Sequence, residues 1–245
     1  NATFLKSYPH FNVIFNEVVK LIYFLYLLFF ILGACIISFL KVIAHDYPQI
    51  SLSRRSHCDY CGRILRWFEI IPIIGYFIVH GKCISCKNQL DFSNPFLEFT
   101  GGLLLCFFLY IGDFSYLSFF VMLIILGFSD SFFGYVYPIF YLLAIPSLLL
   151  RFNHVHWLVA LTIYLTLILL HKKYPLGLGD IEVLTIIGLL FGLNSFLYIL
   201  LLACFFCLIQ YFWYKKRAFR FIPYLTWSTG IIYLLSYLMF RQNLL

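Results

Sequence analysis

Charged residues are scarce in this 245-residue sequence, where Lys, Arg, Asp and Glu together make up 11% of the chain. Soluble domains usually contain about 25% charged and about 45–50% apolar residues, whereas 63% of the residues here are hydrophobic. The chain therefore lacks the polar side chains that a water-facing surface of its size requires, and its mean hydropathy of +0.95 agrees with this. The same composition excludes a disordered chain, a collagen and a small disulfide-rich scaffold. We expect an integral membrane protein whose surroundings are a lipid bilayer.

The sequence also has no long basic stretch interleaved with aromatic residues, a pattern typical of surfaces on which nucleic-acid bases stack. Its formal net charge is +7, from 17 Lys and Arg against 10 Asp and Glu. These basic residues lie in short runs between apolar stretches, where they are typical of membrane topology signals. We therefore expect no nucleic-acid partner.

Apolar stretches of about 20 residues, the length that crosses a bilayer, occupy most of the chain. The first is Leu21–Ile43, and after a polar stretch the chain is almost continuously apolar from residue 95. Turn residues and charges divide this second region into seven segments, which begin near residues 95, 116, 135, 155, 180, 195 and 222. The sequence thus predicts an all-α integral membrane protein with about eight transmembrane helices.

The predicted organisation has three parts: an external N-terminus with the first helix (1–43), a polar loop (44–94) and a seven-helix transmembrane bundle (95–245). With eight spans and an external N-terminus, 13 of the 17 Lys and Arg residues fall on one side. Loops rich in Lys and Arg face the cytoplasm by the positive-inside rule. We therefore expect loop 44–94 to be cytoplasmic.

Half of the eight cysteines lie in this loop, in two CxxC pairs. Cys58 and Cys61 form one pair, and Cys83 and Cys86 form the other, with 21 residues between the pairs. Four thiolates on two tight turns can surround one zinc ion tetrahedrally, and a metal would fold a loop that has little core of its own. Two disulfides or four free thiols are the alternatives, although disulfides are rare on the cytoplasmic side. We expect a structural zinc, and assign the other four cysteines only to apolar packing.

Two aspartates lie at the ends of predicted spans, where acids are costly. A charge at the centre of a membrane helix costs about 2.5–3.5 kcal/mol, so such residues are functional candidates. Asp130 ends the third span, and Asp180 opens the sixth after Gly177 and Gly179, which leave room for a substrate backbone. The predicted topology places both acids near the cytoplasmic edge of the bilayer. Two close carboxyls there would share one proton and could activate water against a peptide bond, as in aspartic proteases.

A helix cap is the alternative function for each acid alone. It fits Asp180, because an acid at a helix N-terminus is stabilised by exposed amides and by the helix dipole. The dipole disfavours a cap for Asp130, which lies at a C-terminal helix end.

In this order the motifs resemble those of the prepilin peptidases, also called type IV leader peptidases. The resemblance rests on Gly33–Val42, the two CxxC pairs, Pro95–Glu98, Asp130 followed by Pro138, and Gly177–Asp180. The chain is most similar to the Gram-positive, competence-associated branch. The resemblance implies a GxGD-type aspartic peptidase with Asp130 and Asp180 as its catalytic pair. Such enzymes cut the basic leader from prepilins or pseudopilins after a glycine, at the cytoplasmic face of the bacterial plasma membrane.

Many members of this family also methylate the new N-terminus with S-adenosylmethionine. The sequence departs from the usual family pattern at Lys41, where Asn is common, and at Glu182, where a basic residue is common. It departs again at Ser93 and Asn94, where a basic and an aromatic residue are common. Cleavage is therefore better supported than methyl transfer. Glu98 matches an acid of the family, and we expect it to pair with a loop arginine, Arg63 or Arg66.

Two other functions share some of these features. Presenilin-like intramembrane proteases have the GxGD signature, but the cysteine loop and the N-terminal motif argue against them. Membrane acids also serve as proton or cation relays in non-enzymatic transport or assembly proteins, which often have internal repeats and broken helices. The sequence has no convincing repeat, and its two acids are expected near one face of the membrane.

Overall fold

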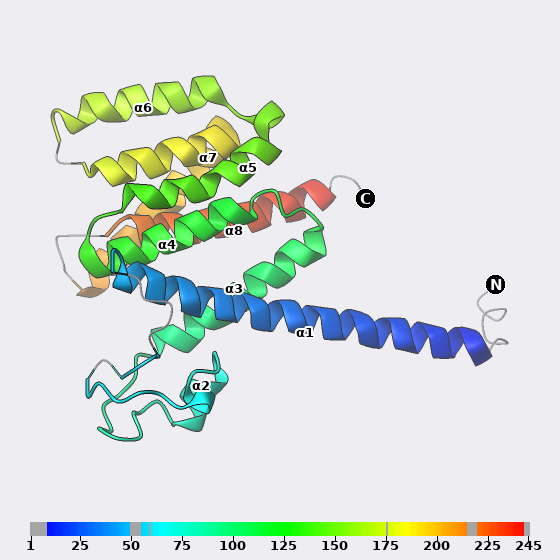
Figure 1. Cartoon of the computed structure of the whole chain (residues 1–245). Helices are drawn as coiled ribbons and strands as arrows, with labels where there is room; N and C mark the ends of the chain where they lie inside the picture. Colours follow the sequence, from blue (N-terminus) through cyan, green and yellow to red (C-terminus); the bar gives the residue numbers. More distant parts are fainter. Residues whose placement is uncertain (1–8, 50–54, 59, 175, 215–219, 243–245) are drawn as a thin grey trace. The chain divides into compact units, whose positions relative to one another are not determined.

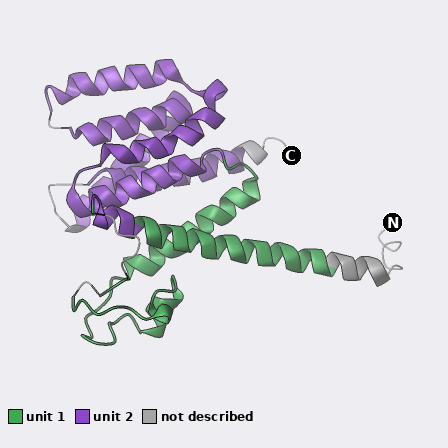
Figure 2. Ribbon diagram, viewed as in Figure 1, with its two compact units in different colours: residues 1–40, 49–114 green, residues 41–48, 115–245 purple. Residues whose placement is uncertain are grey.

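A computed structural model describes residues 9–49, 55–58, 60–174, 176–214 and 220–242, and among these it contains helices and no β-strand (Figure 1). The predicted all-α class is therefore confirmed. The chain divides into two compact units (Figure 2). Unit 1 comprises residues 1–40 and 49–114, and unit 2 comprises residues 41–48 and 115–245.

Unit 1 is built on two membrane-length helices and the loop between them. Its elements are most of α1 (Pro9–Asp46), the short helices η2 (Trp67–Glu69) and α2 (Ile74–Ile78), and α3 (Ser93–Ile111). The two long helices are in backbone contact at glycines, because a Cβ atom added to Gly33 would lie 2.4 Å from the carbonyl oxygen of Gly101. Small residues allow such close approach between membrane helices.

In unit 2 the other helices pack around one central helix, α4 (Leu117–Phe133). The other elements of the unit are η3 (Pro138–Ala144), α5 (Ile145–Leu150), η4 (Phe152–His154), α6 (Trp157–His171), α7 (Leu178–Tyr214) and α8 (Ile222–Gln242). Helix α4 packs against α8, η3 and α5, while α7 packs against α6 and α8. Phe119, Met122, Leu123 and Leu126 of α4 are completely buried, so this helix forms the core of the unit.

Helix α7 is broken at Gly192, whose φ of 73° and ψ of 177° are not helical. Only glycine readily adopts this combination. A Cβ atom here would also lie 3.0 Å from Nε2 of His156. The sequence predicted two spans in this region, separated at Asn194, and the break lies two residues earlier.

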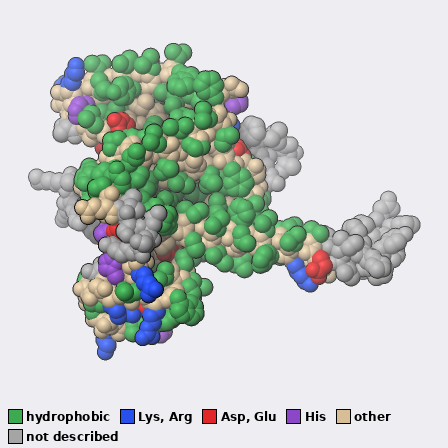
Figure 3. All heavy atoms as spheres, viewed as in Figure 1, with side chains coloured by type: hydrophobic (Ala, Val, Ile, Leu, Met, Phe, Trp, Pro, Cys, Tyr) green, Lys and Arg blue, Asp and Glu red, His purple; other side chains and the backbone are tan. Residues whose placement is uncertain are grey.

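The apolar helices agree with a membrane protein. Among the described residues, three helices are long and apolar enough to cross a bilayer: Asn16–Asp46, Ser93–Ile111 and Leu178–Trp213. Shorter apolar helices are Leu117–Phe133, Pro138–Leu150 and Trp157–His171. Hydrophobic side chains cover much of the visible helical surface (Figure 3).

Candidate active site and metal centre

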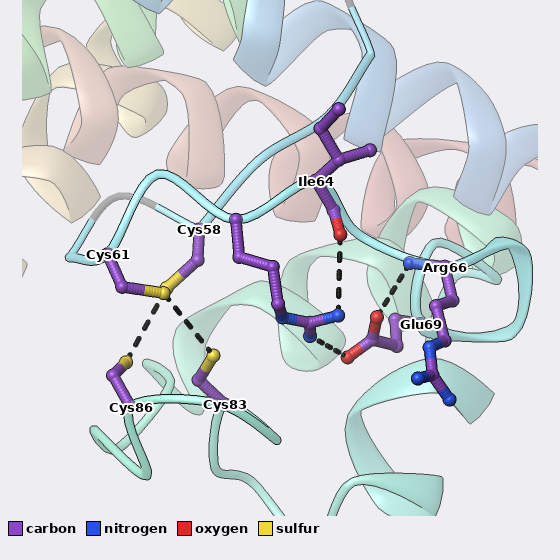
Figure 4. A network of polar contacts seen from close by, with 8 residues as sticks. Cys58, Cys61, Ile64, Arg66, Glu69, Cys83 and Cys86 are labelled. Carbon is purple, nitrogen blue, oxygen red and sulfur yellow. Dashed lines mark hydrogen bonds and ion pairs between the residues drawn. The ribbon is translucent and has the colours of Figure 1, made fainter.

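The four loop cysteines converge on one point in unit 1 (Figure 4). Their Sγ atoms all lie within 4.8 Å of one another, and the Cys58–Cys86 and Cys61–Cys83 sulfur pairs are each 3.9 Å apart. Sulfurs that bind one tetrahedral zinc at about 2.3 Å would be about 3.8 Å apart, whereas a disulfide would join them at about 2.0 Å. The cluster could therefore hold a metal ion, and its geometry argues against the disulfide alternative.

The two cysteine hooks have the same backbone hydrogen bonds. In each, the N–H four residues after the first cysteine donates to the carbonyl oxygen of that cysteine at 2.9 Å. The first cysteine's N–H donates in turn to the carbonyl oxygen five residues on, also at 2.9 Å. The fourth residue has a positive φ, +67° at Gly62 and +58° at Lys87. The glycine indicates this turn in the sequence, but a lysine gives no such signal.

A partly buried ion pair supports the first hook (Figure 4). Nη2 of Arg63 donates to Oε1 of Glu69 at 2.6 Å, and Oε2 of Glu69 accepts from the backbone N–H of Arg66 at 2.6 Å. Burial raises the pKa of Glu69, but these two hydrogen bonds outweigh it and hold the pKa below its usual value. The guanidinium also interacts with the Cys83 thiol.

The Cys83 thiol is itself polarised by the hook. Two backbone N–H groups of the second hook donate to its sulfur and lower its pKa to about 6. This favours the thiolate, which is the form of cysteine that binds metals.

Glu98 has a different partner from the one expected. Its Oε2 accepts a hydrogen bond from the backbone N–H of Ile73 at 2.6 Å, while Arg63 pairs with Glu69. The Glu98 carboxylate thus accepts the backbone N–H of Ile73, a loop residue with a φ of +62°. Glu98 joins the loop to α3.

Asp130 lies in the last turn of α4 and is 7% exposed. Its Oδ2 accepts a hydrogen bond at 3.3 Å from the backbone N–H of Ile222, the first residue of α8. The dipole of α4 disfavours a carboxylate at this position, but the carboxyl of Asp130 contacts the N-terminus of a second helix, α8, whose dipole favours it. Gly134, with a φ of +74°, ends α4 one turn later.

Asp180 lies in the first turn of α7 and is half-buried. A Cβ atom at Gly177 would lie 2.8 Å from Oδ2 of Asp180, and one at Gly179 would lie 2.2 Å from Cγ2 of Val136. A side chain at either position would therefore have to displace Asp180 or Val136. At Gly179 the space that the sequence suggested for a substrate is occupied by Val136.

The two acids lie at the same end of unit 2. At the other end, the ring of Phe191 in α7 packs against two rings at the start of α4. Its centroid lies 5.0 Å from that of Tyr116 and 5.6 Å from that of Phe119. From these contacts α4 extends about 21 Å to Asp130, and α7 extends back about 17 Å to Asp180. Their carboxyl groups are thus within range of a long-range electrostatic interaction.

Three further side chains surround Asp180, and sequence reasoning assigned none of them a function. The hydroxyl of Tyr141 donates to the carbonyl oxygen of Gly179 at 3.5 Å and also interacts with the Glu182 carboxylate. The Cys207 thiol lies within electrostatic range of Asp180. The sequence gives no signal for these contacts, because they depend on how α7 turns at Gly192 and on where η3 packs.

Comparisons with known proteins identify relatives of the chain. Residues 31–111 match the family model described as the bacterial peptidase A24 N-terminal domain. A prepilin leader peptidase/N-methyltransferase of Vibrio cholerae is 26% identical over 239 residues, which cover 84% of this chain and 92% of that protein. Proteins of the same name from Myxococcus xanthus and Bacillus subtilis are each 35% identical, over 77 and 71 residues.

These last two matches span only 23% and 29% of the Myxococcus and Bacillus proteins, and 31% and 28% of this chain. No solved structure matches the chain. The family resemblance that the sequence motifs indicated is nevertheless confirmed by the family model and by these relatives.

Proposed function

We propose, on the premise that this chain is a relative of the prepilin leader peptidases, that it is a membrane aspartic endopeptidase. Its substrates would be type IV prepilins or pseudopilins, cut between the basic leader and the apolar helix, after a glycine. The observation that carries this proposal is that Asp130 and Asp180 lie on different helices and at the same end of unit 2.

The proposed mechanism uses the two carboxyls as a pair that shares one proton. The ionised carboxylate removes a proton from water, whose oxygen attacks the carbonyl carbon of the scissile peptide bond. The protonated carboxyl donates its proton to the carbonyl oxygen. The carbon–nitrogen bond then breaks, and the leaving nitrogen takes the proton that the first carboxyl had removed from water. One hydroxyl of the tetrahedral carbon returns its proton to the second carboxylate, which restores the pair. We place this reaction at the cytoplasmic face of the bacterial membrane, as the positive-inside pattern supports.

Zinc is the metal that we propose for the cysteine cluster. Four thiolates in two hooks form a closed tetrahedral set, which is typical of structural zinc rather than of catalytic zinc, which keeps an open position. The ion would hold Cys58 and Cys61 to Cys83 and Cys86, and so fix the loop that contacts α3 through Glu98.

Methyl transfer from S-adenosylmethionine is a second proposed activity. It is supported by the name of the relatives, which includes an N-methyltransferase. We assign no residue of this chain to it. The departures at Lys41 and Glu182 give it less support than cleavage.

The peptidase proposal is tested by replacing each aspartate separately, Asp130→Asn and Asp180→Asn, and co-expressing each variant with a pilin-like precursor. We expect both variants to insert into the membrane and to leave the precursor uncleaved, because neither can share a proton between two carboxyls. Asp113→Asn, in the turn after α3, is the matched control and should cleave normally. Normal cleavage by both active-site variants would refute the proposal.

The mass of the product separates the alternatives in the same experiment. A cut between the leader and the apolar helix supports a leader peptidase, whereas a cut within the apolar helix would indicate an intramembrane protease. N-terminal methylation of the product tests the second activity. Precursor that the wild-type protein leaves intact would favour a relay or transport function for the acids.

A further inference from the structure

The η2–α2 segment of unit 1 exposes large apolar side chains. Trp67 is 78% exposed, and Ile74, Phe77 and Ile78 are 56%, 57% and 48% exposed. The last three are spaced three and four residues apart in α2, so they share one face of that helix. We call these four residues the α2 patch. A loop domain in water would be expected to bury such a group.

The hydrogen bond to Glu98 fixes the depth of this patch. The backbone N–H of Ile73, the residue before α2, donates to Oε2 of Glu98, and the ring of Tyr76 contacts Phe92 at 5.8 Å. Helix α3 has 19 residues, and its length of about 28 Å is close to the hydrocarbon thickness of about 30 Å. Glu98 lies about 7 Å from the start of this helix. The hydrogen bond therefore holds the start of α2 within about 7 Å of the end of a helix of membrane length, which is the depth to which interfacial helices bury their apolar face.

Two exposed cations flank the patch in the chain. Arg66 precedes Trp67, and Lys82 lies four residues after the end of α2, where its backbone N–H donates to the carbonyl oxygen of Val79 at 3.1 Å. Lys and Arg side chains gather over this loop, beside hydrophobic ones (Figure 3). A tryptophan and aliphatic side chains next to basic residues are typical of elements that lie in the membrane interface.

We infer that the α2 patch inserts into the membrane interface and that Arg66 and Lys82 bind the phosphate groups of anionic phospholipids. Lipid is the occupant because the segment is tethered between α1 and α3, which are themselves of membrane length, and because Glu98 holds α2 at interfacial depth. Anionic headgroups match the charge of the two flanking residues. The loop is thus a monotopic element that sits on the bilayer.

The depth of Trp67 tests this inference. Full-length protein is placed in phosphatidylcholine nanodiscs containing phosphatidylglycerol, and the difference in fluorescence between wild type and Trp67→Phe isolates the emission of Trp67. We expect quenching by lipids brominated on the acyl chain and protection from aqueous iodide. Quenching by iodide without quenching by bromine would overturn the inference. Protection from both quenchers would also overturn it, since it would mean that protein, such as a second copy of the chain, covers the patch.

The anionic part of the inference has its own test. In wild type, quenching of Trp67 by lipids brominated on the acyl chain should be stronger with phosphatidylglycerol present than in phosphatidylcholine alone. Arg66→Gln/Lys82→Gln should abolish this difference, and Lys172→Gln/Lys173→Gln, with the same loss of charge after α6, should retain it. An unchanged lipid dependence in the first double variant, with its metal content intact, would refute the binding of anionic headgroups by these residues.

Discussion

Lys87 and Gly62 occupy the equivalent position in the two cysteine hooks, with φ of +58° and +67°. This left-handed region costs a residue with a side chain roughly 1–2 kcal/mol, whereas glycine adopts it readily. We predict that Lys87→Gly stabilises the metal-bound loop by about 1 kcal/mol, which corresponds to about fivefold tighter metal retention. Competition with a chromophoric chelator on purified full-length protein measures this change.

Gly62→Ala is the control for Lys87→Gly, because it adds a side chain at the equivalent position of the other hook. No atom lies within 4 Å of a Cβ placed at Gly62, so the substitution adds backbone strain without a steric clash. It should weaken metal retention by a similar factor. Weaker retention in Lys87→Gly, or unchanged retention in Gly62→Ala, would contradict the strain argument.

Tyr141 is a positioning residue in the proposed site, since its hydroxyl contacts the backbone of Gly179, next to Asp180. A hydrogen bond of this kind contributes about 1 kcal/mol. We therefore predict that Tyr141→Phe lowers kcat for prepilin cleavage about fivefold while KM stays close to the wild-type value. Initial rates measured against precursor concentration separate the two constants.

Tyr164→Phe is the control for this prediction. The substitution removes the same hydroxyl elsewhere in unit 2, from a tyrosine on α6 that is 40% exposed. It should cleave at the wild-type rate. Equal rates for Tyr141→Phe and Tyr164→Phe would remove Tyr141 from the proposed machinery.

At the scale of elements, the contact between α1 and α3 depends on the absence of side chains. A Cβ atom at Gly33 would meet the backbone of Gly101 at 2.4 Å, and a backbone atom cannot move aside as a flexible side chain can. Gly33→Ala should therefore force the helices apart and destabilise the protein by about 1–3 kcal/mol. We expect a lower midpoint for the thermal loss of helical circular dichroism in detergent.

The same substitution at Gly230 should not lower the thermal midpoint. Gly230 lies within α8, and a Cβ atom there would meet only Phe120, at 4.0 Å. Alanine is favoured over glycine in a helix by about 1 kcal/mol. Gly230→Ala should leave the midpoint unchanged or raise it. A drop as large as that of Gly33→Ala would argue against specific packing at Gly33.

The sequence predicts the helices and the metal ligands better than it predicts the contacts between helices. Apolar runs predict helices because a membrane allows no unpaired backbone, and CxxC spacing predicts the cysteine cluster because each hook is local. The contacts of Asp130 with Ile222 and of Tyr141 with Gly179 join segments distant in the chain. Membrane helices are apolar on every side, so periodicity cannot indicate which face meets a partner.

At the scale of the whole molecule, the metal site belongs to unit 1 alone. Unit 2 has its own apolar core, in which Leu123, Ile187, Ile199 and Leu225 are completely buried. Its helices also keep their backbone hydrogen bonds for a separate reason, since a bilayer offers no water to replace them. The described residues of the cysteine loop include few buried apolar side chains, so the proposed metal would contribute far more to the folding of the loop than to that of the helices.

Removal of the metal should therefore unfold one part of the protein and spare the other. When a chelator is added to reduced, full-length protein in nanodiscs, we predict that helical circular dichroism is largely retained while a protease gains new cleavage sites between residues 55 and 92. Added zinc should restore protection, since the thiols remain close enough to bind it again. Loss of most of the helical signal would mean that the units do not fold independently. An unchanged protease pattern after complete metal removal would mean that the Arg63–Glu69 pair and the Glu98 contact hold the loop without a metal.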